Sequence, residues 1–143
     1  MNKCVLNQLT DRLCNIGDKL GFRNITSRTY GYISEIYITN NHALQIEVDW
    51  RENNLFMYVV YLKNHSLPNK NIIYRYDDGQ WCRKYIEEVY KTKRPVVIDS
   101  SNRYSLDYLF TCFDFYEQLI NSAPFILKNF DETGSLDNKE QSD

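Results

Sequence analysis

The segment 43–62, ALQIEVDWRENNLFMYVVYL, has the pattern of hydrophobic and polar positions expected of a β-hairpin. In its first half, apolar side chains at 44, 46, 48 and 50 alternate with polar ones, which places the two sets on opposite faces of a strand. The second half, from 55 to 62, is apolar at nearly every position and rich in Val, Tyr and Phe, which favour strands. Asn53 and Asn54 between the halves tolerate left-handed backbone and predict a tight two-residue turn.

One face of this hairpin is predicted to line a hydrophobic core. A two-residue turn would pair Val48 with Val59 and Trp50 with Met57, whereas a four-residue loop would shift the partners without changing the faces. In either register the expected core face consists of apolar residues: Leu44, Ile46, Val48, Trp50, Met57, Val59 and Tyr61.

The opposite face of the hairpin mixes acidic and aromatic side chains. It carries Glu47 and Asp49 on the first strand, and Phe56 and Tyr58 on the second. One interpretation is that a helix or loop covers the apolar half. The other is an exposed aromatic surface with a carboxylate edge, as in many protein-binding sites. We therefore take Glu47, Asp49, Phe56 and Tyr58 as candidate partner-binding residues.

The remainder of the chain predicts helices on either side of this hairpin. Apolar residues recur at three- and four-residue steps over Lys3–Leu20, which indicates an amphipathic helix that Gly21 ends. A strand is expected at 30–39, preceded by an irregular or edge segment, and together with the hairpin it makes an antiparallel meander. A short fourth strand at 71–76 is an alternative that the pattern leaves open.

The C-terminal half predicts two further helices. The first begins near Asp77 and Asp78 and runs to about Lys91, with Trp81 and Tyr85 on its apolar side. The second spans 105–121 and has a wide apolar arc, which suggests burial on more than one side.

Length and composition favour one small domain, and the predicted helices and strands make it α+β. A chain of 143 residues that is 43% hydrophobic suits a single core. We expect this domain to cover 1–130, as an antiparallel β-meander of three to four strands with an N-terminal helix and C-terminal helices packed on it. Residues 131–143 carry five acidic side chains against one lysine and are expected to be a disordered acidic tail.

No motif in the sequence declares a catalytic, cofactor or metal site. The nucleophile elbow, the phosphate-binding loops and the HExxH zinc motif are all missing, so we expect neither enzymatic activity nor a cofactor. His42 and His65 would face each other if the hairpin turn has two residues, but no third ligand is evident, and solvated loop positions are favoured. Glu47 and Asp49 are interpreted as solvated or as contacts to a basic partner.

Two other features limit the classes of partner. The four cysteines, Cys4, Cys14, Cys82 and Cys112, form no CxxC pair and are expected to be free thiols of a cytoplasmic chain. No apolar run approaches the length of a membrane span, and no signal peptide is evident, so no membrane partner is expected.

A modest basic region lies between Arg75 and Arg94. Trp81 and Tyr85 interleave it, a combination that can bind nucleic acid. Because acidic residues are mixed in, a solvated surface is favoured and nucleic-acid binding is disfavoured. An oligomeric scaffold or nucleic-acid-binding accessory domain that uses this region remains the alternative function, and a homodimer stays open.

The chain combines an N-terminal helix, a meander with the hairpin xLxIEVDWRxNxLFMYVVxL, an aromatic C-terminal helix and a charged tail. This layout resembles that of small bacterial immunity proteins. These proteins belong to polymorphic-toxin and contact-dependent inhibition systems. The resemblance implies a cytoplasmic, non-enzymatic protein that binds a cognate toxin domain and blocks its active site.

Overall fold

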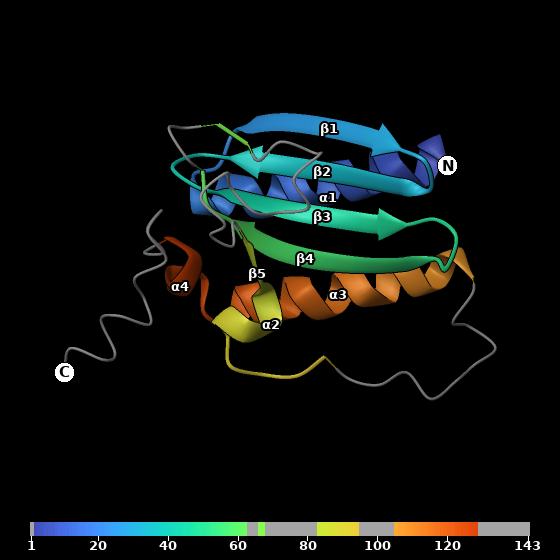
Figure 1. Cartoon of the computed structure of the whole chain (residues 1–143). Helices are drawn as coiled ribbons and strands as arrows, with labels where there is room; N and C mark the ends of the chain where they lie inside the picture. Colours follow the sequence, from blue (N-terminus) through green and yellow to red (C-terminus); the bar gives the residue numbers. More distant parts are fainter. Residues whose placement is uncertain (1, 63–65, 68–82, 95–104, 129–143) are drawn as a thin grey trace.

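A computed structural model describes residues 2–62, 66–67, 83–94 and 105–128 of the chain. It has an N-terminal helix, a five-stranded antiparallel sheet in the order β1-β2-β3-β4-β5, and C-terminal helices (Figure 1). The elements are α1 (Lys3–Leu20), β1 (Asn24–Tyr30), β2 (Ile33–Thr39), β3 (Ala43–Asp49), β4 (Asn54–Val60), β5 (Arg83–Tyr85), α2 (Ile86–Val89), α3 (Leu106–Ser122) and α4 (Pro124–Lys128). The predicted α+β class is confirmed, with more strands than expected. Among the described residues, no helix is both long and apolar enough to span a membrane.

Helix α1 has the bounds that the sequence predicts. The Asn2 side chain accepts a hydrogen bond from the Val5 amide at 3.1 Å and caps the first turn. Gly21 ends the helix in the left-handed conformation, with φ 83°, which glycine adopts without steric cost. The residues at helical spacing between these caps are buried: Val5, Leu9, Leu13, Ile16 and Leu20.

The β3–β4 hairpin has a four-residue loop, so the predicted two-residue turn at Asn53–Asn54 is wrong. Asp49 pairs with Asn54, and the loop comprises residues 50–53. The Asp49 carboxylate accepts hydrogen bonds from the amides of Arg51 and Glu52, at 3.0 and 3.2 Å, while Asn53 takes a positive φ of 49°. Val48 pairs with Leu55 instead of Val59, so the pairing partners shift by four residues. Because this number is even, every side chain keeps its predicted face.

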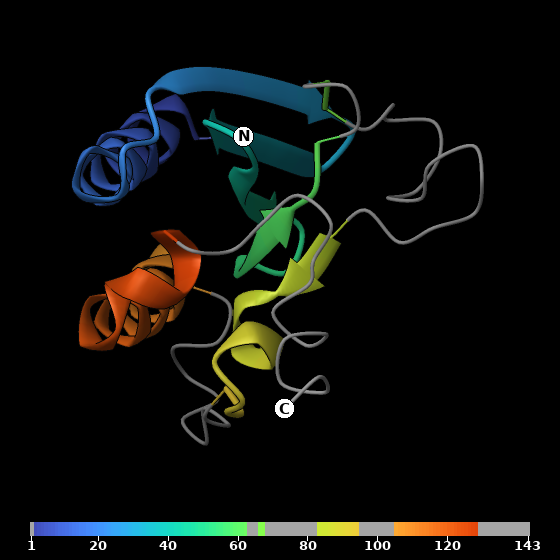
Figure 2. The same ribbon diagram turned by 90° about the vertical axis from the view of Figure 1, so that its left-hand side faces the viewer.

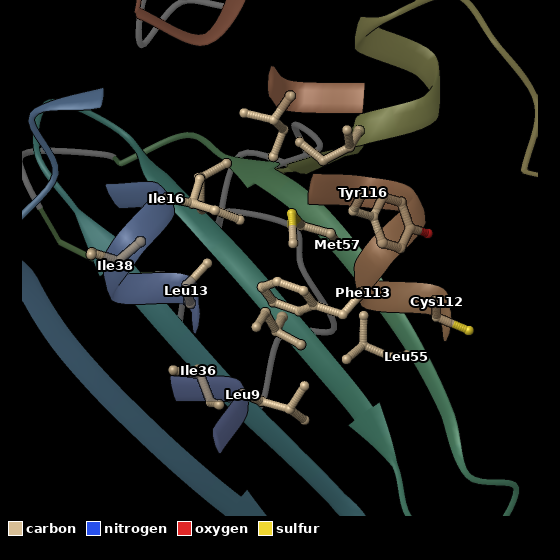
Figure 3. Close-up of a cluster of buried hydrophobic side chains, with 14 of the residues drawn as sticks. Leu9, Leu13, Ile16, Ile36, Ile38, Leu55, Met57, Cys112, Phe113 and Tyr116 are labelled. Atoms are coloured by element: carbon tan, nitrogen blue, oxygen red, sulfur yellow. The ribbon is translucent and has the colours of Figure 1, made fainter. Parts of the chain in front are cut away.

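The core lies between the sheet and the two long helices. Figure 2 shows α1 and α3 side by side on one face of the sheet. The predicted core face of the hairpin is confirmed, because Leu44, Ile46, Val48, Met57 and Val59 are all buried in this cluster. Figure 3 shows part of it, with side chains from α1, α3 and the central strands interleaved. Trp50 and Tyr61 pack against its margin.

The segment around Tyr85 differs from its prediction. Instead of a helix running to Lys91, residues Arg83–Tyr85 form β5 and only Ile86–Val89 are helical. Tyr85 pairs with Tyr58, so the open edge of β4 recruits this segment as a strand. The expected strand at 71–76 and the expected tail at 131–143 lie outside the described residues, as does Trp81.

Candidate functional site

The candidate site lies on the face of the sheet that points away from α1 and α3, which we call the second face. Two rows of side chains cross it from strand to strand. In the first row, Glu35 on β2 lies opposite Glu47 on β3, and Glu47 lies opposite Phe56 on β4. The second row runs across four strands, with the order Tyr37, Gln45, Tyr58 and Tyr85.

Two carboxylates directly opposite each other in a sheet repel, and Gln45 and Arg83 offset this repulsion. Glu35 is 1% exposed, and its Oε2 accepts a hydrogen bond from Gln45 Nε2 at 2.6 Å. Arg83 Nη1 donates to Gln45 Oε1 at 3.2 Å and to Glu47 Oε2 at 3.1 Å. The side chains of Arg83 and Glu47 are 14% and 17% exposed, so this ion pair is largely shielded from water. The result is a fixed, bridged arrangement of charges.

Aromatic rings stack beside this charge network. The Arg83 guanidinium lies 3.6 Å from the centre of the Tyr58 ring, within the range of a cation–π contact. Tyr85 stands 4.7 Å from Tyr58 and 6.1 Å from Phe56, measured between ring centres. Burial, followed by the nearby Glu47 carboxylate, raises the pKa of Tyr58 well above that of an ordinary tyrosine. Tyr58 therefore stays neutral, and its ring is the surface against which Arg83 and Tyr85 pack.

The four residues predicted to bind a partner have different environments. Glu47 is paired with Arg83, and Asp49 caps the hairpin loop, with both side chains half-buried. Phe56 is half-buried, whereas Tyr58 is only 3% exposed. Of the two interpretations of this face, the covered one applies to Tyr58, which belongs to a second small hydrophobic cluster with Tyr37, Ala43, Val60 and Leu62. A role of the four residues in partner binding remains a prediction.

Three residues of the site were not assigned to this face from the sequence. The position of Glu35 in its strand puts it on the second face, but the sequence gives no sign that Glu47 on β3 lies opposite it. Arg83 and Tyr85 lie two residues apart, as strand neighbours on one face do, but three residues are too few for the alternation to be read. Tyr85 is the most exposed ring of the group, with 40% of its surface exposed.

His42 is buried, so the expected solvated position for it is wrong. It is 3% exposed, its Nε2 lies 3.0 Å from the Leu127 carbonyl oxygen, and the Phe22 ring packs edge-on at 4.9 Å. The four-residue loop also removes the register that would set it opposite His65, which lies outside the described residues. Across the described part of the chain, no three potential ligand side chains from His, Cys, Asp and Glu cluster closely enough for a metal ion.

Two arginines of the basic region between Arg75 and Arg94 make contacts with other residues of the fold. Arg83 pairs with Glu47, and Arg94 donates to the Leu55 carbonyl at 2.9 Å and to Asn54 Oδ1 at 2.6 Å. Arg94 also lies against Phe56, with 4.9 Å to the ring centre. Arg75 lies outside the described residues. These contacts reduce the charge that the described part of the region presents to nucleic acid.

The described cysteines are free, as predicted. Cys4 is exposed, Cys14 is half-buried and Cys112 is buried, while Cys82 lies outside the described residues. Cys112 contacts the Arg94 guanidinium, but burial outweighs this contact and raises the pKa of the thiol. Cys112 therefore acts as a small core side chain rather than a reactive thiolate.

Replacing Arg83 should reveal the repulsion between Glu35 and Glu47. We expect Arg83→Met, which keeps an apolar side chain over Tyr58, to lower the free energy of unfolding by about 1–3 kcal/mol, because it removes a partner from a shielded carboxylate. Adding Glu47→Gln to this variant should restore at least half of the loss. Urea unfolding at neutral pH measures both effects. Equal destabilisation by Arg83→Met with and without Glu47→Gln would instead mean that Arg83 acts only by packing on Tyr58.

Comparison of the whole chain with protein-family models, with curated proteins and with solved structures finds no match.

Proposed function

We propose that this protein is a non-enzymatic, protein-binding inhibitor of the immunity class, and that it uses the second face around Tyr85 to block the active site of a cognate toxin domain. The observation that carries the proposal is the environment of Tyr85. Its ring is 40% exposed, yet it rests against the buried Tyr58 ring at 4.7 Å and flanks Phe56 at 6.1 Å. Exposed aromatic rings on a rigid support are typical centres of binding energy in protein interfaces.

The charges next to Tyr85 are already held in place. Arg83 stacks on Tyr58 and pairs with Glu47, so neither side chain has to be ordered when a partner arrives. Ordering a long side chain on binding costs about 0.5–1.5 kcal/mol, which a preorganised surface avoids. This rigidity supports a binding role for the second face.

The charge balance of the second face favours a basic partner surface. Among the described strand residues of this face, the carboxylates of Glu35, Glu47 and Asp49 outnumber the guanidiniums of Arg28 and Arg83. Toxin domains that cleave nucleic acids need basic clefts for phosphate, and an acidic surface can occupy such a cleft. Asp49 lies at the end of the face next to the hairpin loop, where a partner can approach it.

The proposal predicts that the reading frame next to that of this protein encodes a toxin domain, and this domain is the binding partner to test. Calorimetry should show tight binding, and co-expression should protect cells from the toxin. We expect Tyr85→Ala to raise the Kd by about 30-fold or more, the loss typical of a central aromatic anchor.

The matched control is Phe125→Ala, which removes a ring on α4 that is 61% exposed and belongs to a different part of the surface. Its Kd should stay within about threefold of the unmodified protein. An unchanged Kd for Tyr85→Ala would exclude the second face as the binding site. No binding and no protection by the unmodified chain would contradict the inhibitor function itself.

A further inference from the structure

Strand β1 is accessible on both of its faces, unlike β2, the strand beside it. Its residues from Asn24 to Ser27 are exposed, Arg28 is half-buried, and Ile25 has 39% of its surface in contact with water. The neighbouring strand β2 is buried at five consecutive positions from Ser34 to Ile38. β1 ends the strand order, so within the described residues one of its edges pairs with β2 and no strand follows on the other (Figure 1). An uncovered apolar side chain on such an edge is a common site of strand pairing.

The register of the sheet shows which backbone groups of β1 point outward. The Trp50 amide donates to the Tyr32 carbonyl at 2.9 Å, so even-numbered residues of β2 bond to β3 and odd-numbered residues face β1. The Thr39 carbonyl, which accepts from the Arg23 amide at 3.1 Å, agrees with this assignment. Since odd residues of β2 lie opposite even residues of β1, the amide and carbonyl groups of Ile25 and Ser27 point to the outer edge.

We infer that β1 pairs antiparallel with β1 of a second copy of this chain, about a two-fold axis at Thr26. Ile25 then lies opposite Ser27 of the second copy, and each such pair exchanges both of its backbone hydrogen bonds. Thr26 lies opposite its own counterpart, a favourable cross-strand pair. The pairing joins two sheets into one continuous sheet and covers Ile25.

The charges along β1 are compatible with this register and with a second copy as the occupant. Arg28 is the strand's one charged residue, and the two-fold at Thr26 places it opposite the neutral Asn24 of the second copy. A two-fold at Arg28 would set two guanidiniums directly opposite each other, which is unfavourable. The strand contains no lysine or proline, the residues that commonly prevent edge strands from pairing with the same strand of another copy.

The pairing edge and the proposed inhibitory site lie apart. β1 is at one end of the strand order, whereas Tyr85 belongs to β5 at the other end. The second face around Tyr85 therefore remains accessible in the dimer. Dimer formation and toxin binding can be tested independently, because variants of β1 leave Tyr85 and its supports unchanged.

Sedimentation of the full chain tests the inference. The unmodified protein should pass from monomer to dimer over roughly ten to several hundred micromolar, as expected of a small interface. Ser27→Pro removes the outward amide without removing a bond to β2, and should raise the dimer Kd at least about tenfold. Ser27→Ala keeps that amide and should dimerise like the unmodified chain.

Ile25→Lys provides a second disruption that leaves the backbone intact, and it should also favour the monomer. Circular dichroism identifies variants that fold normally, and Ile25→Lys decides the result if Ser27→Pro does not fold. An unmodified chain that stays monomeric throughout this concentration range would overturn the inference, even if β1 accepts a strand from another protein. A dimer that survives in the folded disrupting variant would overturn it as well.

Discussion

Raising the pH from about 10 to about 12 is expected to unfold this protein cooperatively, because ionisation of its buried tyrosines is linked to unfolding. Tyr37, Tyr58 and Tyr116 are at most 3% exposed, and burial raises the pKa of each above its ordinary value near 10. Burial also raises the pKa of Tyr90 to about 12.

The loss of stability at high pH follows because the folded protein binds the tyrosine protons more tightly than the unfolded chain does. A tyrosine whose pKa is higher in the folded protein contributes its full stability below pH 10, the ordinary value, and loses it as pH rises toward the folded value. Each such residue lowers the free energy of unfolding by about 1.4 kcal/mol per pH unit in this window. Three together remove roughly 4 kcal/mol per unit, a large share of the ~5–15 kcal/mol that stabilises a typical domain.

Urea unfolding at successive pH values, with tyrosinate absorbance recorded in parallel, measures this loss. Ionisation of the buried tyrosines should coincide with the loss of circular dichroism. Tyr116→Phe serves as the control, since it removes one ionisable group together with the hydrogen bond from Tyr116 to Glu87 Oε2 at 3.0 Å. The slope of stability against pH should fall by about one tyrosine's share, or 1.4 kcal/mol per unit. Full ionisation while the fold persists would contradict the prediction.

The sequence predicts best those features that depend on neighbours along the chain. The bounds of α1 follow from Asn2, Gly21 and the apolar spacing between them, all of which act within a few residues. The faces of β3 and β4 follow from alternation alone. Their register does not, because it depends on whether Asp49 caps a four-residue loop or Asn53 and Asn54 form a tight turn. Both turns are compatible with the residues present.

Features that depend on distant segments were missed. His42 is buried because the Leu127 carbonyl, 85 residues away in sequence, lies against its ring. Tyr85 belongs to a strand because the edge of β4 is open to it, although the local pattern from 77 to 91 is compatible with a helix. The site was found only in part for the same reason. Glu47 and Phe56 lie on the hairpin and share a visible pattern, whereas Glu35, Arg83 and Tyr85 join them only through strand pairing.

Truncating Phe113 is expected to destabilise the fold more than replacing Arg83, by about 3–5 kcal/mol for Phe113→Ala. The ring is 0% exposed and belongs to the cluster in which Leu13 of α1, Met57 of β4 and α3 itself meet (Figure 3). The cavity left by its removal would thus border both helices and the sheet. Urea unfolding at neutral pH measures the effect.

A second contact on Phe113 separates it from an ordinary core residue. The Arg12 guanidinium lies 4.4 Å from the ring centre while it pairs with Asp114 at 2.6 Å and with Glu117 at 2.8 Å. The ring therefore supports the ion pairs that join α1 to α3, and its loss frees Arg12 to move. Phe113→Leu keeps most of the volume and should cost less than about 1.5 kcal/mol beyond the lost cation–π contact. Phe125→Ala, at a ring that is 61% exposed, should change stability by less than about 0.5 kcal/mol. Similar losses for Phe113→Ala and Phe125→Ala would show that the two helices do not depend on this ring.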